Sequence, residues 1–144
     1  MKLKSSAFEH HRPIPKKYTG DGEDVSPPLS FDEVPAGTVS LALIVDDPDA
    51  PRGTFDHWIT WNLPPEAKEL AEGVQGLKEG KNHFDELRYR GPLPPKGPQH
   101  RYFFKLFALD TKIDLPEGIS KKELEDAMEG HILGKAELVG TYQR

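Results

Sequence analysis

Prolines and glycines interrupt this chain along its whole length, and this feature limits its fold more than any other. The 144 residues contain 14 prolines and 13 glycines, scattered throughout. Because proline removes a backbone donor and interrupts helices, the pattern favours many short strands joined by turns over a helical bundle. The length fits a single domain, residues 1–144, built around one core.

Four stretches have the hydrophobic pattern of strands. Residues 38–45 are β-branched and aliphatic, which predicts a buried strand. Residues 101–109 carry apolar side chains on both faces, as in a central strand covered on both sides. Residues 135–142 predict a last strand. Residues 57–63 alternate, which places on one face His57, Ile59, Trp61 and Leu63.

One helix is signalled near the C-terminus. Ser120 and Glu123 have the spacing of a capping box, which satisfies backbone N–H groups at the start of a helix. Apolar residues at helical spacing then form one stripe, made of Leu124, Ala127, Met128, His131 and Ile132. The sequence therefore predicts a helix that reaches Ile132 and stops at Gly134. A helical turn is also expected within residues 65–72.

The composition excludes several classes of protein. The chain has no cysteine, so it forms no disulfide and offers no thiolate. Its net charge of −5 argues against binding nucleic acid through a basic stripe. No apolar run approaches the roughly 20 residues that span a bilayer, and the first residues lack the apolar region of a secretory signal. We expect a cytoplasmic protein without stable membrane insertion.

The segment Asp47-Pro48-Asp49-Ala50-Pro51 directly follows the first predicted strand. Each proline fixes its own backbone and restricts the residue before it, so the two carboxylates are held in fixed directions. The Ala50–Pro51 bond is a candidate for the cis form. A solvated acidic turn that prevents edge pairing explains the same residues, and the spacing alone does not separate the two interpretations.

A second stiff loop runs over residues 91–99, where glycine and proline predominate. His100 then opens a strand that carries Tyr102 on the same face. If this strand lies beside the strand that contains His57, the two histidines, Tyr102 and Asp47 converge on one pocket. The alternative is an ordinary proline-rich connection with a structural histidine. The long segment 78–99 is itself typical of functional loops.

These motifs together resemble the phosphatidylethanolamine-binding protein family, which includes the Raf kinase inhibitor proteins and their bacterial and archaeal relatives. The resemblance covers nearly the whole chain. It is carried by residues 26–31, 47–51, 57–64, 89–95, 100–104 and 140–142, and most specifically by Asp47-Pro48-Asp49-Ala50-Pro51, His57-Trp58 and His100-Arg101-Tyr102.

The resemblance implies a mainly β fold of two antiparallel sheets packed as a sandwich, with one or two short helices near the C-terminus. It also implies a small anion pocket lined by Asp47, Pro51, Phe55, His57, Gly91, Pro94, Pro95, His100 and Tyr102. Phe55 stands where the family often has tryptophan. The chain is shorter than animal members and is expected to lack the extra C-terminal helix that flanks the pocket in them, so their ligand preferences are not carried over.

The expected function is non-enzymatic binding of phosphate or a phosphorylated head group, without metal or cofactor, in a regulatory or inhibitory role. Histidine and tyrosine donate hydrogen bonds to phosphate oxygens, and a carboxylate behind an imidazole fixes its tautomer and favours its protonated form. Anion binding is therefore expected to strengthen as the pH falls. Arg101 is expected to form a structural ion pair with Asp49.

Two other functions fit the same residues. Asp47, His57 and His100 are the residue types of a metal site with two histidines and one carboxylate. Relatives are also reported to inhibit serine proteases or kinases, and the stiff loop over residues 91–98 is the candidate contact for such a protein partner. A homodimer is compatible with the sequence, which does not fix the oligomeric state.

Overall fold

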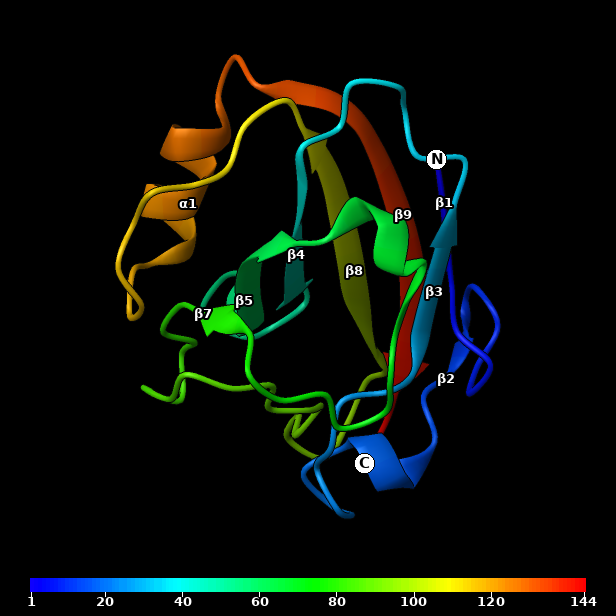
Figure 1. The fold of residues 1–144 in the computed structure, drawn as a ribbon. Helices are drawn as coiled ribbons and strands as arrows, with labels where there is room; N and C mark the ends of the chain where they lie inside the picture. The colour runs from blue at the N-terminus through cyan, green and yellow to red at the C-terminus, as the bar shows by residue number, and fades with distance from the viewer.

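Two β-sheets packed face to face form most of the computed structural model, which describes all 144 residues (Figure 1). The larger sheet has the strand order β2-β9-β8-β4-β5-β7, and the smaller has the order β1-β3-β6. All neighbouring strands are antiparallel except β2 and β9. The predicted mainly β sandwich with a short helix near the C-terminus is therefore confirmed.

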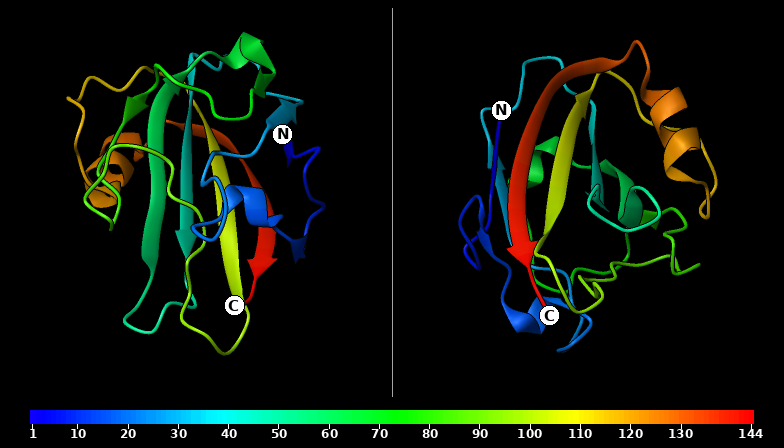
Figure 2. Two further views of the ribbon diagram at one scale, coloured as in Figure 1. Left: turned by 90° about the horizontal axis from the view of Figure 1, so that it is seen from below. Right: turned by 180° about the vertical axis from the view of Figure 1, so that it is seen from behind.

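Four long strands form the centre of the larger sheet and lie side by side in Figure 2. They are β4 (Ser40–Asp47), β5 (Phe55–Leu63), β8 (His100–Leu109) and β9 (Ile132–Tyr142). The other elements are short: β1 (Lys2–Lys4), β2 (Arg12–Pro13), η1 (Lys16–Tyr18), β3 (Leu29–Asp32), η2 (Pro65–Ala67), β6 (Glu69–Leu70), β7 (Lys78–Glu79) and α1 (Lys121–Met128).

Apolar side chains cover both faces of the larger sheet, as predicted for β8. One core lies between the two sheets and includes Trp58, Tyr102 and Phe104. The other lies on the opposite face, where Leu124 and Met128 of α1 take part in it. The strands β4, β5 and β8 each contribute to both cores, whereas β9 contributes Leu138 to the core between the sheets.

The helix α1 begins as predicted but ends early. Ser120 and Glu123 form the capping box. The helix stops at Met128, and Gly130 then takes a left-handed conformation with φ of 81°. His131 and Ile132 are not helical, because Ile132 pairs with Leu109 and starts β9. The prediction of a helix that reaches Ile132 is therefore wrong, whereas the helical turn expected within 65–72 is present as η2.

Two irregularities in β5 overturn the predicted common face of His57, Ile59, Trp61 and Leu63. Val45 faces Trp58 while Asp46 faces Asp56, so His57 is an extra residue without a partner on β4. A second shift occurs near Asn62, which has φ of 56°. Strict alternation therefore fails at both ends of the strand. Ile59 and Trp61 belong to the helix-side core, whereas Leu63 belongs to the core between the sheets.

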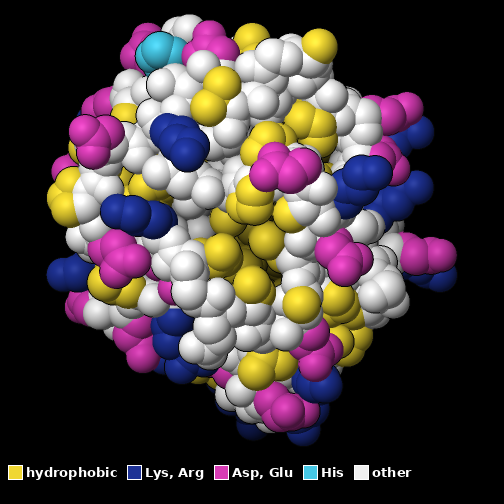
Figure 3. All heavy atoms as spheres, in the orientation of Figure 1, with side chains coloured by type: hydrophobic (Ala, Val, Ile, Leu, Met, Phe, Trp, Pro, Cys, Tyr) yellow, Lys and Arg dark blue, Asp and Glu magenta, His cyan; other side chains and the backbone are white.

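The connection between β4 and β5 is built without a cis peptide bond. All peptide bonds are trans, including Ala50–Pro51, so the cis candidate is wrong. None of the helices has the length and apolar character needed to traverse a bilayer. On the face drawn in Figure 3, acidic and basic side chains are interspersed, and hydrophobic side chains gather in a central hollow.

Candidate functional site

A cavity of about 220 Å³ lies at one end of the larger sheet. It is lined by Asp47, Ala50, Pro51, Phe55, His57, Phe84, Leu93, Pro94, Pro95, His100 and Tyr102. The structure thus brings together every residue of the predicted pocket except Gly91. Three of its walls come from the end of β4, the start of β5 and the start of β8, and the fourth comes from the long loop before β8.

His100 is paired with a carboxylate in the interior. Its Nδ1 lies 2.7 Å from Oδ2 of Asp47, and both side chains are less than one-tenth exposed. The other oxygen of Asp47 accepts the backbone N–H of Asp49 at 2.8 Å. Because an ionised carboxylate only accepts hydrogen bonds, Nδ1 of His100 carries the hydrogen. In the neutral ring, Nε2 is then the nitrogen without one.

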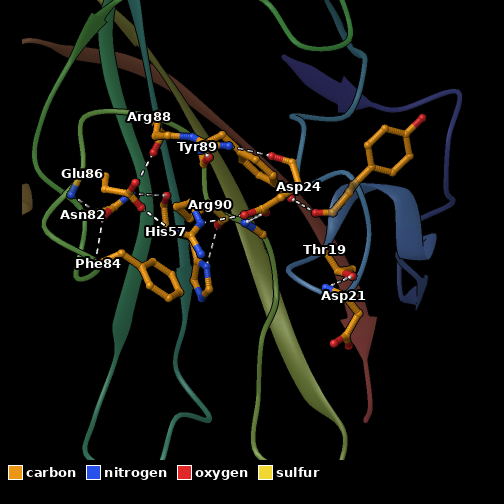
Figure 4. Close-up of polar contacts among 12 residues, drawn as sticks. Thr19, Asp21, Asp24, His57, Asn82, Phe84, Glu86, Arg88, Tyr89 and Arg90 are labelled. Carbon is orange, nitrogen blue, oxygen red and sulfur yellow. Dashed lines mark hydrogen bonds and ion pairs between the residues drawn. The ribbon is translucent and has the colours of Figure 1, made fainter.

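His57 has a different partner. Its Nδ1 lies 2.7 Å from the carbonyl oxygen of Arg90, and this contact appears in Figure 4. Since a carbonyl only accepts, Nδ1 again carries the hydrogen and Nε2 has none in the neutral ring. Burial lowers the pKa of His57, against the opposing effects of the Arg90 carbonyl and the negative charge of Asp47.

Tyr102 supplies a hydroxyl group to the same cavity. The side chain is buried, and its oxygen has no hydrogen-bond partner within the protein. Burial raises the pKa of Tyr102, and the negative charge of Asp47 raises it further, so the hydroxyl keeps its hydrogen. A buried hydroxyl without a partner is costly, and a bound oxygen atom would supply the missing contact.

Aromatic rings form one wall of the cavity. The ring centres of Phe55 and Phe84 lie 5.1 and 5.7 Å from that of His57, and Figure 4 shows Phe84 beside the imidazole. The guanidinium of Arg90 lies 4.4 Å from the centre of the Phe84 ring. Arg90 also binds Asp24 at 2.6 Å and pairs with Glu86. Arg90, itself held by Asp24 and Glu86, therefore helps to fix the position of the Phe84 ring.

The loop that carries Phe84 is organised by the buried side chain of Asn82. Its amide oxygen accepts the backbone N–H groups of Phe84 and Glu86 at 2.8 and 3.1 Å. Its amide nitrogen donates to the Arg88 carbonyl at 2.8 Å. The position of Phe84 therefore follows from side-chain contacts within the loop, because residues 80–99 contain no helix or strand.

Gly91 does not line the cavity, and its role is different. Its N–H donates to Oδ1 of Asp24 at 2.6 Å. A Cβ atom at this position would lie 2.0 Å from the carbonyl oxygen of Tyr18. Glycine is required here because two segments of backbone pack closely, which holds the start of the proline-rich loop in place.

Contacts from three segments fix the outer parts of the site. Arg101 binds Asp49 through two guanidinium contacts of 2.9 Å and lowers the pKa of this carboxyl. Gln143 donates to the Gly97 carbonyl at 2.8 Å, and Arg144 donates to the Pro94 carbonyl at 3.4 Å. The two loops beside the cavity are therefore tied to the ends of β8 and β9.

The geometry differs from that of a metal site. No group of three or more histidine, aspartate or glutamate side chains has an arrangement that could hold a metal ion. Asp47 already uses one oxygen for His100 and the other for Asp49. Larger hollows of about 610 and 440 Å³ exist beside β1 and beside Glu79. Neither contains two histidines, so they do not reproduce the chemistry of the smaller cavity.

Three lining residues were missing from the prediction, namely Ala50, Phe84 and Leu93. Ala50 and Leu93 lie inside the two stiff loops that the sequence singled out, so those loops were the available signal. Phe84 lies in the segment 78–99, which was expected to be functional because of its length. Nothing in its local sequence distinguishes this phenylalanine from a core residue.

Comparisons with known proteins show the family and agree with the fold. The family described as phosphatidylethanolamine-binding protein matches residues 4–143. A protein of Methanothermobacter thermautotrophicus named UPF0098 protein is 51% identical, with 100% of this chain and 99% of that protein covered. A crystal structure of a phosphatidylethanolamine-binding protein homologue from Chlamydia trachomatis has a TM-score of 0.95 at 47% identity, and covers 99% and 97% of the two chains. The structure of E. coli YbcL, described as a member of the mammalian family, has a TM-score of 0.92 at 28% identity, and covers 99% and 98%.

Proposed function

Because this chain belongs to the phosphatidylethanolamine-binding protein family, we propose that it binds small oxyanions without catalysing a reaction. The ligand class is phosphate or the phosphorylated head group of a larger molecule. Binding would serve a regulatory or inhibitory role in which the cavity between His57 and His100 is the recognition site.

One observation carries this proposal. Two imidazole rings, each with its Nδ1 already paired, and a hydroxyl group without a partner line the same small cavity. Protonated imidazoles and a tyrosine hydroxyl are good donors to oxyanions. Asp47 lies behind His100 and supplies a countercharge when that ring is protonated.

The size of the cavity supports a small ligand. Its 220 Å³ lies below the roughly 300–1,000 Å³ of typical sites for drug-sized molecules. A phosphate group fits such a volume, whereas a lipid tail would remain outside. The aromatic and proline side chains around the cavity exclude water and so strengthen hydrogen bonds made inside it.

Calorimetric titration with inorganic phosphate at about pH 6.5, the usual histidine pKa, tests the proposal. We expect saturable binding that weakens roughly tenfold or more in the variant His100→Gln. His131→Gln is the matched control, because His131 forms the same Nδ1–carboxylate pair with Asp110, at 2.8 Å on the surface. Absence of phosphate binding by the unmodified protein would remove the function.

The proposed site also predicts a pH dependence. Sulfate stays a dianion across the neutral range, so its affinity reports on the protein alone. We expect sulfate to bind more tightly as the pH falls from about 8 to about 5.5, because an imidazole must gain a proton before its Nε2 can donate to an anion, and the usual histidine pKa is about 6.5. Because burial lowers the pKa of His57, its protonation contributes at the acid end. Equal affinity at both pH values would contradict this mechanism.

Inhibition of a serine protease or a kinase is a second candidate, favoured by the side chain of Leu93. It is 38% exposed on the stiff loop over residues 91–98, as a residue that enters a partner's cleft would be. Assays against chymotrypsin-like and elastase-like proteases test the protease role. Inhibition that is lost in Leu93→Asp supports it, and no inhibition by the unmodified protein removes it.

A further inference from the structure

We propose that an oxyanion binds in this cavity only when hydrogen atoms lie between its oxygens and the Nε2 atoms of His57 and His100. These hydrogens come from the anion itself or from protonation of the histidines. The cavity therefore prefers phosphate and phosphate monoesters over sulfate and phosphodiesters. This inference rests on the proposed function and names the class of anion. Phosphate keeps an ionisable P–OH group at neutral pH, and a monoester regains one near pH 6. Sulfate and phosphodiesters have no such group.

The argument begins with the hydrogen atoms on the two rings. Each Nδ1–H is used by a fixed acceptor, which is the Arg90 carbonyl for His57 and the Asp47 carboxylate for His100. Each neutral ring therefore has only Nε2 left, and this atom accepts hydrogen bonds. Tyr102 is the one side chain in the cavity that has a hydrogen to donate while both rings are neutral.

The three polar groups that an anion would contact are Nε2 of His57, Nε2 of His100 and the hydroxyl of Tyr102. When both rings are neutral, the two Nε2 atoms are acceptors and offer no hydrogen to an anion that carries none. Oxygen lone pairs that face an unprotonated Nε2 repel it, and the contact becomes favourable only when one hydrogen lies between the two atoms. Hydrogen phosphate brings one such hydrogen itself. Sulfate brings none, so it must take up one more proton than phosphate to make the same contacts.

The charged groups around the rings do not remove this requirement. His57 is influenced by the negative charges of Asp47 on β4, Asp24 on the N-terminal segment and Asp56 on β5. Asp47 and Asp49 are the acidic groups beside His100. No lysine or arginine lines the cavity. Arg101 is engaged with Asp49, and Arg90 is engaged with Asp24 and Glu86.

The burial of His57 gives the anion's own hydrogen an advantage. Burial opposes a positive charge on this ring and lowers its pKa. A P–OH group that donates to Nε2 leaves the ring neutral, and so it avoids that cost. The preference for phosphate over sulfate is therefore expected to be largest at high pH, where both rings are neutral.

Calorimetry with the unmodified protein tests the inference. At about pH 8 we expect inorganic phosphate to bind roughly tenfold or more tightly than sulfate, and the ratio to fall at about pH 5.5, which lies below the usual histidine range. Titrations in buffers of different ionisation enthalpy should show about one more proton taken up with sulfate than with phosphate. At about pH 6, phosphoethanolamine should bind more tightly than glycerophosphoethanolamine, a diester.

The variant His57→Gln replaces the Nε2 acceptor with an amide that can donate, so the ratio of phosphate to sulfate affinity should fall toward one. His131→Gln, on the surface, should leave it unchanged. Equal affinities and equal proton uptake for the two anions would overturn this inference while anion binding itself stands. If neither anion binds at any pH, the proposed function fails as well. Tighter binding of sulfate than of phosphate at about pH 8, or of the diester than of the monoester at about pH 6, would also overturn the inference.

Discussion

His57 and His100 both lie at the start of a strand, yet their neighbours give them different properties. The ring of His100 has the carboxylate of Asp47 beside it, so a positive charge there has a partner. The ring of His57 contacts an uncharged carbonyl and two phenylalanine rings. The same side chain is therefore placed in a charged and in an apolar setting within one cavity.

This difference predicts how His57 affects stability. Burial lowers the pKa of His57 in the folded protein. As the pH falls below the usual value of about 6.5, this residue therefore binds a proton in the unfolded chain before it does so in the folded protein. The free energy of unfolding should therefore fall as the pH drops from about 6.5, by at most about 1.4 kcal/mol per pH unit from this residue. Urea unfolding should show a shallower loss in His57→Gln. Identical pH profiles would contradict the assignment.

Gly91 allows a second test at a single position. The variant Gly91→Ala should be destabilised by about 1–3 kcal/mol, because its Cβ would meet the backbone of Tyr18. Gly20→Ala is the control, since a Cβ there would meet side-chain atoms of Leu93, at 2.7 Å from Cδ1 and 3.1 Å from Cβ and Cγ, rather than backbone. Thermal unfolding of both variants measures the difference. A Gly91→Ala protein as stable as Gly20→Ala would show that the close packing is not required.

The sequence predicted the main polar residues of the site because each stands in a stiff motif or opens a strand. The bulge at His57 could not be predicted, since it depends on how β5 pairs with β4. Nor could the contact of His57 with Arg90, which comes from a loop without regular structure. The positions were thus recoverable, whereas the hydrogen-bond partners required the folded chain.

At the scale of elements, α1 is fastened to the larger sheet by a buried charge cluster. Asp46 on β4 and Asp56 on β5 face each other across the strands. Lys121, at the start of α1, contacts both carboxylates at 3.3 and 2.8 Å, and Lys105 contacts Asp46 at 3.1 Å. Asp46 and Asp56 directly precede the cavity residues Asp47 and His57 in the sequence, so the cluster holds the strand segments that carry them.

Removal of one charge from this cluster should be costly. We expect Lys121→Met to reduce the free energy of unfolding by roughly 2–4 kcal/mol, because it leaves buried carboxylates short of a partner. Lys122→Met is the neighbouring control. Its pair with Asp126 is exposed, so the loss should stay below about 0.5 kcal/mol. Equal losses in denaturant titrations of the two variants would show that the cluster does not stabilise the fold.

Long and short elements differed in how well the sequence predicted them. The four central strands were recognised because their alternation or apolar content extends over several residues. The strands β1, β6 and β7 have two or three residues, and their pairing depends on contacts with distant segments rather than on a local pattern. The end of α1 was misplaced because pairing with Leu109 competes with the helical stripe.

At the scale of the whole molecule, ligand binding and folding should be coupled. If phosphate binds only the folded protein, saturating phosphate raises the free energy of unfolding, by about 2.7 kcal/mol at one hundred times the dissociation constant. The melting temperature should therefore rise with phosphate in the unmodified protein. At the same concentrations it should rise much less in His100→Gln. A shift of equal size in that variant would indicate a general salt effect.

The cavity has walls from four stretches of chain that lie far apart in the sequence. None of these stretches holds enough of the polar groups to recognise an anion alone. A fragment of this protein, or a partly assembled folding intermediate, should therefore not bind phosphate, even if much of its secondary structure has formed. In a pulse-labelling experiment during refolding, the additional protection of backbone amides by phosphate should appear only when the last of these four stretches has joined the cavity.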